Sequence, residues 1–294
     1  MRIAAVRTAL GSRTALVVGE FLYDVQTLLG QSRSLPDVTA LLVGDEPLIR
    51  RLAPVHKEIL AGAHRGAAIS AEQTADLGPP VSRPEKILCA GLNYLDHVAE
   101  LGVPVPVNPL VFAKLPSAIS GPRDRIRLPA ASGAVDYEVE LAVVIGRAGR
   151  NIPLAEARRH VAGYLVCNDV SARDWQFDSE GQLTLGKGFD SFFPAGPWLT
   201  TADEIADPDA LAIRTTVNDE VRQESRTSEL VRGVDELVSW LSTVCTLTPG
   251  DIIATGTPAG VGASRMPPRY LQPGDVVRCE IEGLGAITNV VTTA

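Results

Sequence analysis

The sequence predicts an α+β protein that is mostly β, with a small N-terminal α/β domain before a larger, strand-rich domain. Short apolar runs bounded by Gly, Pro, Asn or Asp recur from about residue 84 onward, which is typical of β-strands. Only a few segments space their apolar residues as a helix does. The Pro-rich stretch DLGPPVSRPEK separates the two regions, so we place the domains at residues 1–76 and 77–294.

The N-terminal region begins with alternating, β-like runs around Gly11 and Gly19 that continue to about residue 30. The segment VTALLVGDEPLIRRLAPVHKEILAG follows, and its apolar residues recur at helical spacing. This order predicts a few short strands and then helix, which is the small α/β domain.

In the larger region, strands are predicted where the sequence reads ILCAGLNY, VELAVVIG, LAIRTTVN, VRQES, DIIATGT and VVRCEIEG. LAIRTTVN and VRQES are expected to form a hairpin that turns through Asn218 and Asp219. One helix is predicted at VDELVSWLSTVC, because an apolar stripe runs along it and Asp235 and Glu236 lie in its first turn, where the dipole favours negative charge.

Length and composition are those of a folded globular protein, since 45% of the 294 residues are hydrophobic and 21% are charged. The net charge of −8 argues against sequence-independent binding to nucleic acid or to an anionic membrane, because both require a positive surface. We therefore expect a small-molecule partner, and neither a nucleic-acid nor a membrane partner.

The N-terminal apolar runs are interrupted by Arg2, Arg7 and Arg13, so they lack the core of a secretory signal. Nowhere do roughly 18 apolar residues follow one another, as a membrane-spanning helix requires. The 4 cysteines are far apart, without a C-x-x-C pair, which indicates buried, unpaired thiols in a reducing compartment. These features predict a cytoplasmic protein.

Two glutamates interrupt the apolar run AVDYEVELAVVIGR. Glu138 and Glu140 are two positions apart, so a strand would point both carboxylates to the same face. Such a face must meet water, basic side chains or a cation, because burying an ionised carboxylate without a partner costs free energy. Asp169 ends another apolar run, GYLVCND, and can join them from a neighbouring strand. These oxygen ligands suit Mg²⁺, Mn²⁺ or Ca²⁺ rather than zinc; a solvated strand is the alternative.

Two further segments carry groups that bind anions. Lys187 lies between glycines in LTLGKGFDSFF, where its ammonium could hold an oxyanion or a substrate carboxylate; a surface lysine in a loop is the alternative. In GDIIATGTPAGVG, the backbone N–H groups and the hydroxyl of Thr257 could cradle an anionic group, or the stretch is a plain turn. The stretch lacks the G-K-[ST] ending of a nucleotide-binding loop.

His97 and Glu100 occur in GLNYLDHVAE at a spacing of three residues. On a helix these positions share a face, so Glu100 can orient His97 as a general base, although an ordinary surface contact has the same spacing. The sequence contains no G-x-S-x-G elbow and no cysteine in an activating context, which disfavours a covalent serine or cysteine hydrolase.

The order and spacing of six motifs resemble those of the fumarylacetoacetate hydrolase superfamily over about residues 84 to 290. These motifs are GLNYLDHVAE, VDYEVELAVVIG, GYLVCNDVSARDWQ, GKGFDSFFPAGPW, VNDEVRQESRTSELV and PGDIIATGTPAGVG. The chain looks most similar to the bacterial branch that includes 2,4-diketo-3-deoxy-sugar-acid hydrolases and acylpyruvases. The resemblance implies a mixed β-sandwich roll of the fumarylacetoacetate hydrolase C-terminal type, and a homodimer.

The resemblance also implies a role for each candidate site residue. The implied ligands of Mg²⁺ or Mn²⁺ are Glu138, Glu140 and Asp169. The implied catalytic groups are Lys187 and the pair His97 and Glu100, which the family carries on a mobile lid. The implied substrate-binding residues are Arg173, Gln176 and Thr257. The fourth metal-binding carboxylate of the founding enzyme has no clear counterpart in this sequence.

These roles predict a metal-dependent hydrolase that cleaves a carbon–carbon bond of a β-diketo acid with water activated by His97 and Glu100. The substrate would be an acylpyruvate, a fumarylacetoacetate-like compound or a 2,4-diketo-3-deoxy sugar acid. The alternative is a metal-dependent decarboxylase, tautomerase or isomerase of a 2-oxo acid such as oxaloacetate or a homoprotocatechuate-pathway intermediate. A non-catalytic cation-binding protein is less favoured, because such a site needs neither Lys187 nor His97.

Overall fold

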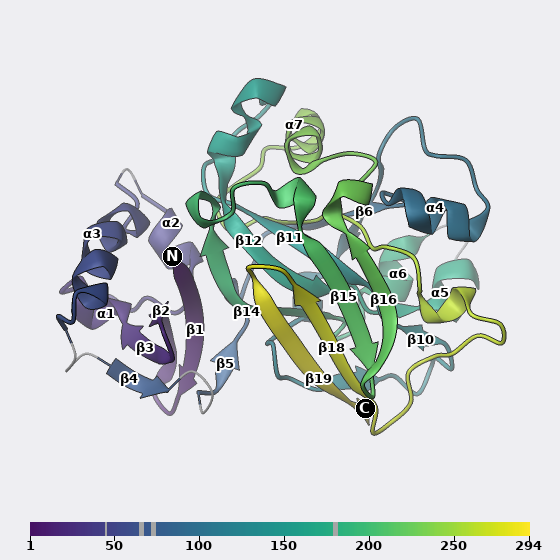
Figure 1. Cartoon of the computed structure of the whole chain (residues 1–294), viewed down its shortest axis with the longest axis horizontal. Helices are drawn as coiled ribbons and strands as arrows, with labels where there is room; N and C mark the ends of the chain where they lie inside the picture. The colour runs from purple at the N-terminus through teal and green to yellow at the C-terminus, as the bar shows by residue number, and fades with distance from the viewer. Residues whose placement is uncertain (45, 65–67, 72–74, 179–181) are drawn as a thin grey trace.

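The computed structural model describes residues 1–44, 46–64, 68–71, 75–178 and 182–294. Figure 1 shows the N-terminal strands and helices at one end and the strand-rich remainder of the chain beside them. Among the described residues, strands outnumber helices and form mixed sheets, which confirms the α+β, mostly β fold class.

The N-terminal region is an antiparallel sheet flanked by helices. Its strands are β1 (Arg2–Thr8), β2 (Gly11–Val18), β3 (Phe21–Asp24), β4 (Ala68–Ala71) and β5 (Leu77–Gly78). Its helices are α1 (Val25–Leu28), α2 (Thr39–Leu42) and α3 (Ile49–Leu60). The predicted strands around Gly11 and Gly19 are therefore confirmed. The predicted helical segment contains two helices, because Gly44 adopts a φ of 102° between them.

Strand β1 also joins the N-terminal sheet to the rest of the chain. It pairs with β14 (Phe193–Thr201) in antiparallel register, with Arg2 opposite Thr200. The resulting sheet has the order β4-β3-β2-β1-β14-β12-β11-β17-β6-β7. The two regions thus share one sheet, and their division at residues 76 and 77 stays a prediction.

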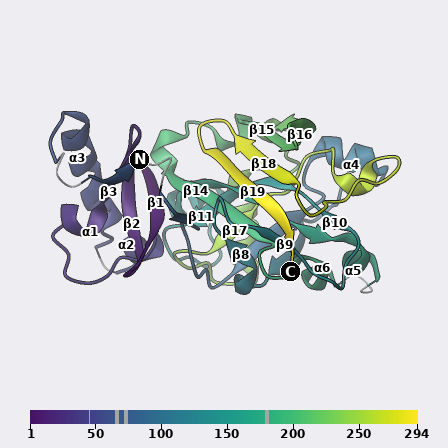
Figure 2. The same ribbon diagram turned by 90° about the horizontal axis from the view of Figure 1, so that it is seen from below.

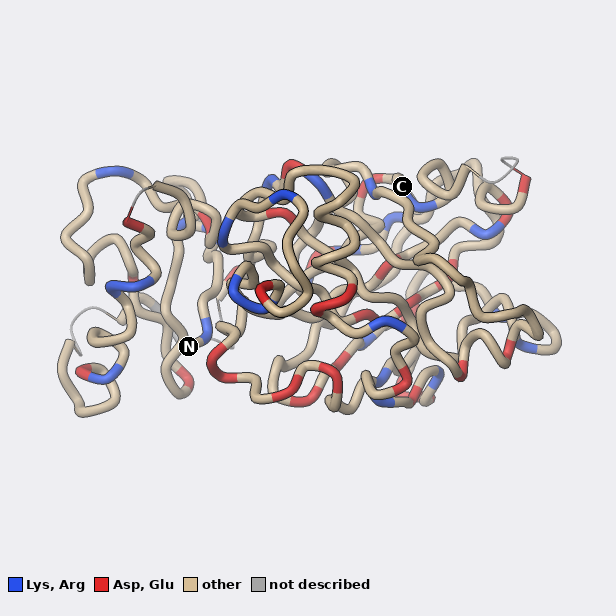
Figure 3. The backbone as a smooth tube through the Cα atoms, turned by 90° about the horizontal axis from the view of Figure 1, so that it is seen from above, with Lys and Arg blue, Asp and Glu red and all other residues tan. Residues whose placement is uncertain are grey.

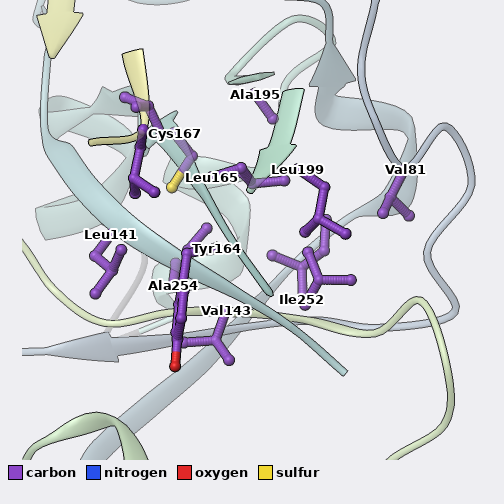
Figure 4. Close-up of a cluster of buried hydrophobic side chains, with 14 of the residues drawn as sticks. Val81, Leu141, Val143, Tyr164, Leu165, Cys167, Ala195, Leu199, Ile252 and Ala254 are labelled. Carbon is purple, nitrogen blue, oxygen red and sulfur yellow. The ribbon is translucent and has the colours of Figure 1, made fainter. Parts of the chain in front are cut away.

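Beyond β14, the sheet continues through five apolar strands, and all of them except β7 were predicted from the sequence. These are β6 (Ile87–Gly91), β7 (Leu110–Lys114), β11 (Val139–Ile145), β12 (Val161–Asn168) and β17 (Ile252–Ala254). Every residue of β11 is buried, as expected for a strand covered on both faces. Figure 4 shows side chains from β11, β12, β14 and β17 that meet in the core, among them Leu141, Leu165, Leu199 and Ile252.

A second sheet lies against the first, as Figure 2 shows. Its strands, in spatial order, are β16 (Glu220–Arg226), β15 (Ala212–Val217), β18 (Val276–Ile281), β19 (Gly285–Thr293) and β9 (Ile126–Leu128). The β15–β16 hairpin turns through Asn218 and Asp219, whose φ values of 52° and 63° are those of a tight hairpin turn. The hairpin prediction is confirmed.

The remaining elements connect these sheets. The short strands are β8 (Ile119–Ser120), β10 (Val135–Asp136) and β13 (Ser171–Ala172). The α-helices are α4 (Leu95–Leu101), α5 (Arg173–Asp178), α6 (Leu183–Lys187) and the predicted α7 (Val234–Val244). The 3₁₀ turns are η3 (Pro116–Ala118), η4 (Leu154–His160), η5 (Ala202–Glu204), η6 (Pro208–Ala210), η7 (Thr227–Glu229) and η8 (Gly262–Ser264).

Charged residues of both signs are interspersed along the chain, as Figure 3 shows. Within the described ranges, no helix has the length and apolar character to cross a membrane. The four cysteines are unpaired, and Cys89, Cys167 and Cys279 are buried, which confirms their expected role as small core residues.

Candidate metal and active site

The three predicted carboxylates meet where β11 begins and β12 ends. These strands are antiparallel, with Val139 opposite Asn168, so Glu138 and Asp169 are neighbours across the strand pair. The amide of Asp169 donates a hydrogen bond to the carbonyl of Glu138 at 2.8 Å. Glu138, Glu140 and Asp169 are all buried, and one oxygen of each lies within 4.8 Å of the others. The structure therefore brings together the predicted oxygen ligands.

Basic side chains neutralise two of these carboxylates. The ammonium of Lys187 contacts Glu138 Oε2 at 2.8 Å and Asp169 Oδ2 at 2.7 Å. The guanidinium of Arg173 contacts Glu138 Oε1 at 2.7 Å. Lys187 is the last residue of α6, and its side chain is only 3% exposed, so the alternative of a solvated surface lysine is wrong.

Sequence reasoning missed a second lysine in this cluster. The Lys114 ammonium, at the end of β7, donates to Asp169 Oδ1 at 2.5 Å and to the carbonyl of Val170 at 3.0 Å. Its side chain is fully buried. Burial lowers the pKa of Lys114, against the opposing effect of Asp169. The sequence did contain a signal, because Lys114 is the last residue of the apolar run LVFAK. In a strand with one face exposed to solvent, apolar and polar residues would alternate.

Glu140 differs from its two neighbours because no ion pair among the described residues includes it. Its Oε2 accepts a hydrogen bond from the amide of Gly256 at 2.8 Å. Burial and then the carboxylates of Asp169 and Glu138 raise the pKa of Glu140 well above its usual value. Burial also opposes ionisation of Glu138, but Lys187 and Arg173 outweigh it and lower that pKa to about 2. A buried carboxylate without a cationic partner, beside two other carboxylates, fits a hard divalent cation.

The raised pKa of Glu140 predicts that metal binding releases protons. Below that pKa the carboxyl is protonated, so a cation must displace its proton, and the affinity should rise with pH until Glu140 is ionised. Calorimetric titration with Mn²⁺ in buffers of different ionisation enthalpy should reveal proton release on binding at pH values where Glu140 is still protonated. A binding enthalpy that is the same in every buffer would contradict this prediction.

A cavity of about 270 Å³ opens onto the carboxylate cluster. Its polar lining includes the predicted residues His97, Glu138, Glu140, Arg173, Gln176, Lys187 and Thr257. Leu101, Val103, Leu110, Phe112 and Phe177 form part of its apolar wall. A larger cleft of about 950 Å³ lies beside α2 and α3, but none of the predicted site residues lines it.

The predicted pair of His97 and Glu100 is formed on α4. His97 is buried, and its Nδ1 lies 2.9 Å from Glu100 Oε2. A carboxylate at Nδ1 favours the proton on that nitrogen and leaves Nε2 as the basic atom. Burial raises the pKa of Glu100, but hydrogen bonds with His97 and Gly260 outweigh it and lower the pKa. The pair therefore combines an oriented imidazole with an ionised carboxylate at the edge of the cavity.

Arg173 and Gln176, the predicted substrate-binding pair, contact each other on α5. Arg173 Nη1 donates to Gln176 Oε1 at 2.9 Å, and Arg173 Nε donates to Asp136 Oδ2 at 2.9 Å. Asp136 was not predicted, and it also accepts hydrogen bonds from the amides of Gly262 and Ala263. Arg173 is thus held between Asp136 and Glu138, and its predicted role in substrate binding stays a prediction.

The glycine-rich loop after β17, residues 255–263, differs from both sequence interpretations. Five of its amides donate to acidic side chains of the protein, so these five are not free to bind an anion and the loop is more than a plain turn. The acceptors are Glu140 for Gly256, Asp96 for Ala259, Glu100 for Gly260, and Asp136 for Gly262 and Ala263.

The hydroxyl of Thr257 is similarly engaged. It donates to the carbonyl of Val139 at 3.0 Å and accepts from Gln223 Nε2 at 2.8 Å. To donate to a substrate carboxylate, it would have to rotate away from Val139, so its predicted role stays a prediction.

Comparison with known proteins agrees with this architecture. Residues 86–292 match the family model described as fumarylacetoacetate (FAA) hydrolase C-terminal. The chain belongs to the fumarylacetoacetate hydrolase family. The prediction of this family from the six motifs is therefore confirmed.

Individual family members differ in their reactions. A relative from Bos taurus, named oxaloacetate tautomerase FAHD2A, mitochondrial, is 55% identical over 213 residues, which cover 72% of this chain and 68% of that protein. The crystal structure of a putative HpcE protein from Mycobacterium smegmatis is 39% identical, with a TM-score of 0.84 and full coverage of both chains. Maleylpyruvate hydrolase from Sphingobium sp. SYK-6, in complex with manganese(II) ion and pyruvate, is 32% identical, with a TM-score of 0.81 and full coverage of both chains.

These relatives correct the prediction of a cytoplasmic protein. The oxaloacetate tautomerases from Bos taurus, Xenopus laevis and Homo sapiens are named as mitochondrial, which contradicts that prediction. The N-terminal region lacks a secretory core and the sequence lacks closely spaced cysteine pairs. Those features separate secreted proteins from others, but they do not separate one reducing compartment from another.

Proposed function

We propose that this protein is a divalent-metal-dependent tautomerase of oxaloacetate or a similar 2-oxo acid. This was the alternative to the hydrolase predicted from the sequence. The similarity to relatives named oxaloacetate tautomerase, at 52 to 55% identity, carries the proposal. The site is consistent with it, because keto–enol exchange requires a base and charge stabilisation but no attacking water.

Glu138, Glu140 and Asp169 would hold Mg²⁺ or Mn²⁺, which are among the ions suited to three carboxylate oxygens. A bound ion would supply Lewis-acid stabilisation of the negative charge that develops on the substrate oxygen. The manganese and pyruvate in the Sphingobium structure support this assignment for the family.

The acid–base work falls to His97 and its partners. His97 Nε2 would take a proton from the carbon next to the 2-oxo group, and Glu100 would stabilise the resulting imidazolium through Nδ1. The ammonium of Lys187 would stabilise the charge that develops on the substrate oxygen. The imidazolium of His97 would then return its proton to this oxygen, which gives the enol and restores neutral His97. In the reverse direction the same groups convert the enol to the keto form. The reaction therefore consumes no co-reactant.

Hydrolysis of a carbon–carbon bond is the second candidate. The observation that favours it is the pair His97 and Glu100, which could equally deprotonate a water molecule. The solved structure named maleylpyruvate hydrolase is also similar to this chain over its whole length. A small-molecule oxo acid as substrate is common to both proposals, and a homodimer stays a prediction.

The test compares three reactions of the Mn²⁺-loaded protein. Loss of the ultraviolet absorbance of enol-oxaloacetate measures tautomerisation, and a coupled assay measures pyruvate released from oxaloacetate or from an acylpyruvate. We expect enol loss well above the buffer rate without pyruvate release, and no acceleration once the metal is removed by a chelator. Pyruvate from an acylpyruvate without enol exchange would favour the hydrolase, and pyruvate from oxaloacetate would favour a decarboxylase.

A further inference from the structure

Helix α4 is tied to the loop after β17 by two acidic side chains four residues apart. The amide of Ala259 donates to Asp96 Oδ1 at 3.3 Å, and the next amide, that of Gly260, donates to Glu100 Oε1 at 2.9 Å. Residues at i and i+4 share one face of a helix, so this face of α4 meets two successive backbone N–H groups. Glu100 also binds His97, whereas Asp96 is not among the residues that line the cavity.

The second oxygen of Asp96 reaches the other sheet. Ser225 Oγ, on β16, donates to Asp96 Oδ2 at 2.6 Å. Two residues earlier on the same strand, buried Gln223 donates to Thr257 Oγ1 and to the carbonyl of Pro258, both at 2.8 Å. Residues two apart on a strand share a face, so β16 supports the loop through Gln223 and α4 through Ser225. Asp96 therefore bridges helix, loop and strand.

The packing of α4 makes these polar contacts important. Of its seven residues, only His97 and Val98 are buried. Leu95 is 47% exposed and Leu101 is 44% exposed, so neither side chain is packed into the hydrophobic core, where it would hold the helix in place. Few apolar contacts are available to set the position of His97, and hydrogen bonds from the helix to its neighbours carry more of that task.

We propose that Asp96 is a positioning residue that holds α4 against the 259–260 amides and Ser225, so that His97 faces the carboxylate cluster. It acts through His97 and does not touch the substrate. As far as turnover is concerned, this inference rests on the proposed function. The docking of α4 can also be measured without any substrate.

Asp96→Ala removes both contacts, and Ser225→Ala removes one of them. Asp96→Asn keeps an oxygen acceptor for Ala259 and a group that can bond to Ser225, but it removes the negative charge from the first turn of α4. If Asp96 acted only through its charge on the helix dipole, the alanine and asparagine variants would be equally impaired. Asp37→Ala is the matched control, because Asp37 also binds a serine hydroxyl and backbone amides, of Ser82 and Thr39, beside α2 and away from the cavity.

For Asp96→Ala we expect kcat for oxaloacetate tautomerisation to fall by on the order of 10²-fold, the scale of a displaced reacting group. Ser225→Ala should show a smaller loss, and Asp96→Asn should recover most of the activity. The Mn²⁺ affinity, measured by calorimetry, should stay at the wild-type value in all of them. Hydrogen exchange at residues 95–101 and at the 259 and 260 amides should become faster in Asp96→Ala. Asp37→Ala should lower the melting temperature and leave kcat and this exchange unchanged.

The inference is overturned if Asp96→Ala retains wild-type exchange in α4, or if Asp37→Ala loses as much kcat as Asp96→Ala. A parallel loss of Mn²⁺ affinity in Asp96→Ala would also overturn it, because the defect would then lie in the whole site. If the wild-type protein does not exchange the protons of oxaloacetate, the proposed function fails. The exchange measurement still decides whether Asp96 docks α4.

Discussion

Alanine at Glu138, Glu140 or Asp169 is expected to abolish both Mn²⁺ binding and turnover. Each substitution removes one of three anionic oxygen ligands from a buried site, and the loss of that charge and ligand atom weakens the binding of a hard cation. Calorimetric titration with Mn²⁺ measures the effect directly. An exposed glutamate on β18, Glu280, provides the control, and Glu280→Ala should bind Mn²⁺ as the wild type does.

The three variants should differ in stability, which separates loss of a ligand from loss of the fold. Glu138 and Asp169 are paired with buried cations, and removing one partner of such a pair costs about 3–5 kcal/mol. Glu140 has no such partner among the described residues, and its ionisation is disfavoured by burial. A fourth variant, Glu140→Gln, keeps the size of the side chain. Thermal unfolding should therefore show that it is as stable as the wild type, although it binds no Mn²⁺. Wild-type Mn²⁺ affinity in all three alanine variants would mean that these carboxylates form no metal site.

The second large effect concerns the base and leaves the metal site intact. His97→Ala should reduce turnover by roughly 10² or more, the contribution typical of a general base, while the Mn²⁺ affinity is retained. The reason is positional, because His97 comes from α4 and the three carboxylates come from β11 and β12. His160→Ala is the matched control, since His160 also uses Nδ1 in a hydrogen bond, to the carbonyl of Arg147, but it is absent from the cavity lining.

Glu100→Gln isolates the charge of Glu100 from its contact with the loop. The amide oxygen can still accept from Gly260, but a neutral side chain no longer stabilises the imidazolium of His97. We expect a loss of turnover of similar order, roughly 10²-fold, with normal Mn²⁺ binding. Normal turnover in both His97→Ala and Glu100→Gln would remove this pair from the mechanism, whichever reaction is catalysed.

The parts of the site that the sequence predicted correctly are those set by local periodicity. Glu138 and Glu140 share a direction because side chains alternate along a strand, and His97 reaches Glu100 because positions i and i+3 adjoin on a helix. Asp169 could be added because a strand visibly ends at that position. The β15–β16 hairpin was predictable for the same reason, since Asn218 and Asp219 tolerate the left-handed backbone of the turn.

Only the tertiary structure decided how these groups are neutralised and held. Lys114 lies 55 positions from Asp169 in the chain, and Asp96 lies 163 positions from Ala259, yet both pairs are in contact. Amino-acid periodicity carries information over a few residues, whereas these contacts depend on the order of strands in the sheets and on the path of the loop after β17. The sequence by itself therefore determined which carboxylates share a face and which histidine has a carboxylate partner. The fold decided that Lys187 is buried and that the glycine-rich loop binds acidic side chains of the protein. It also decided that, of the three carboxylates, Glu140 has no cationic partner within the part of the chain that the structure describes.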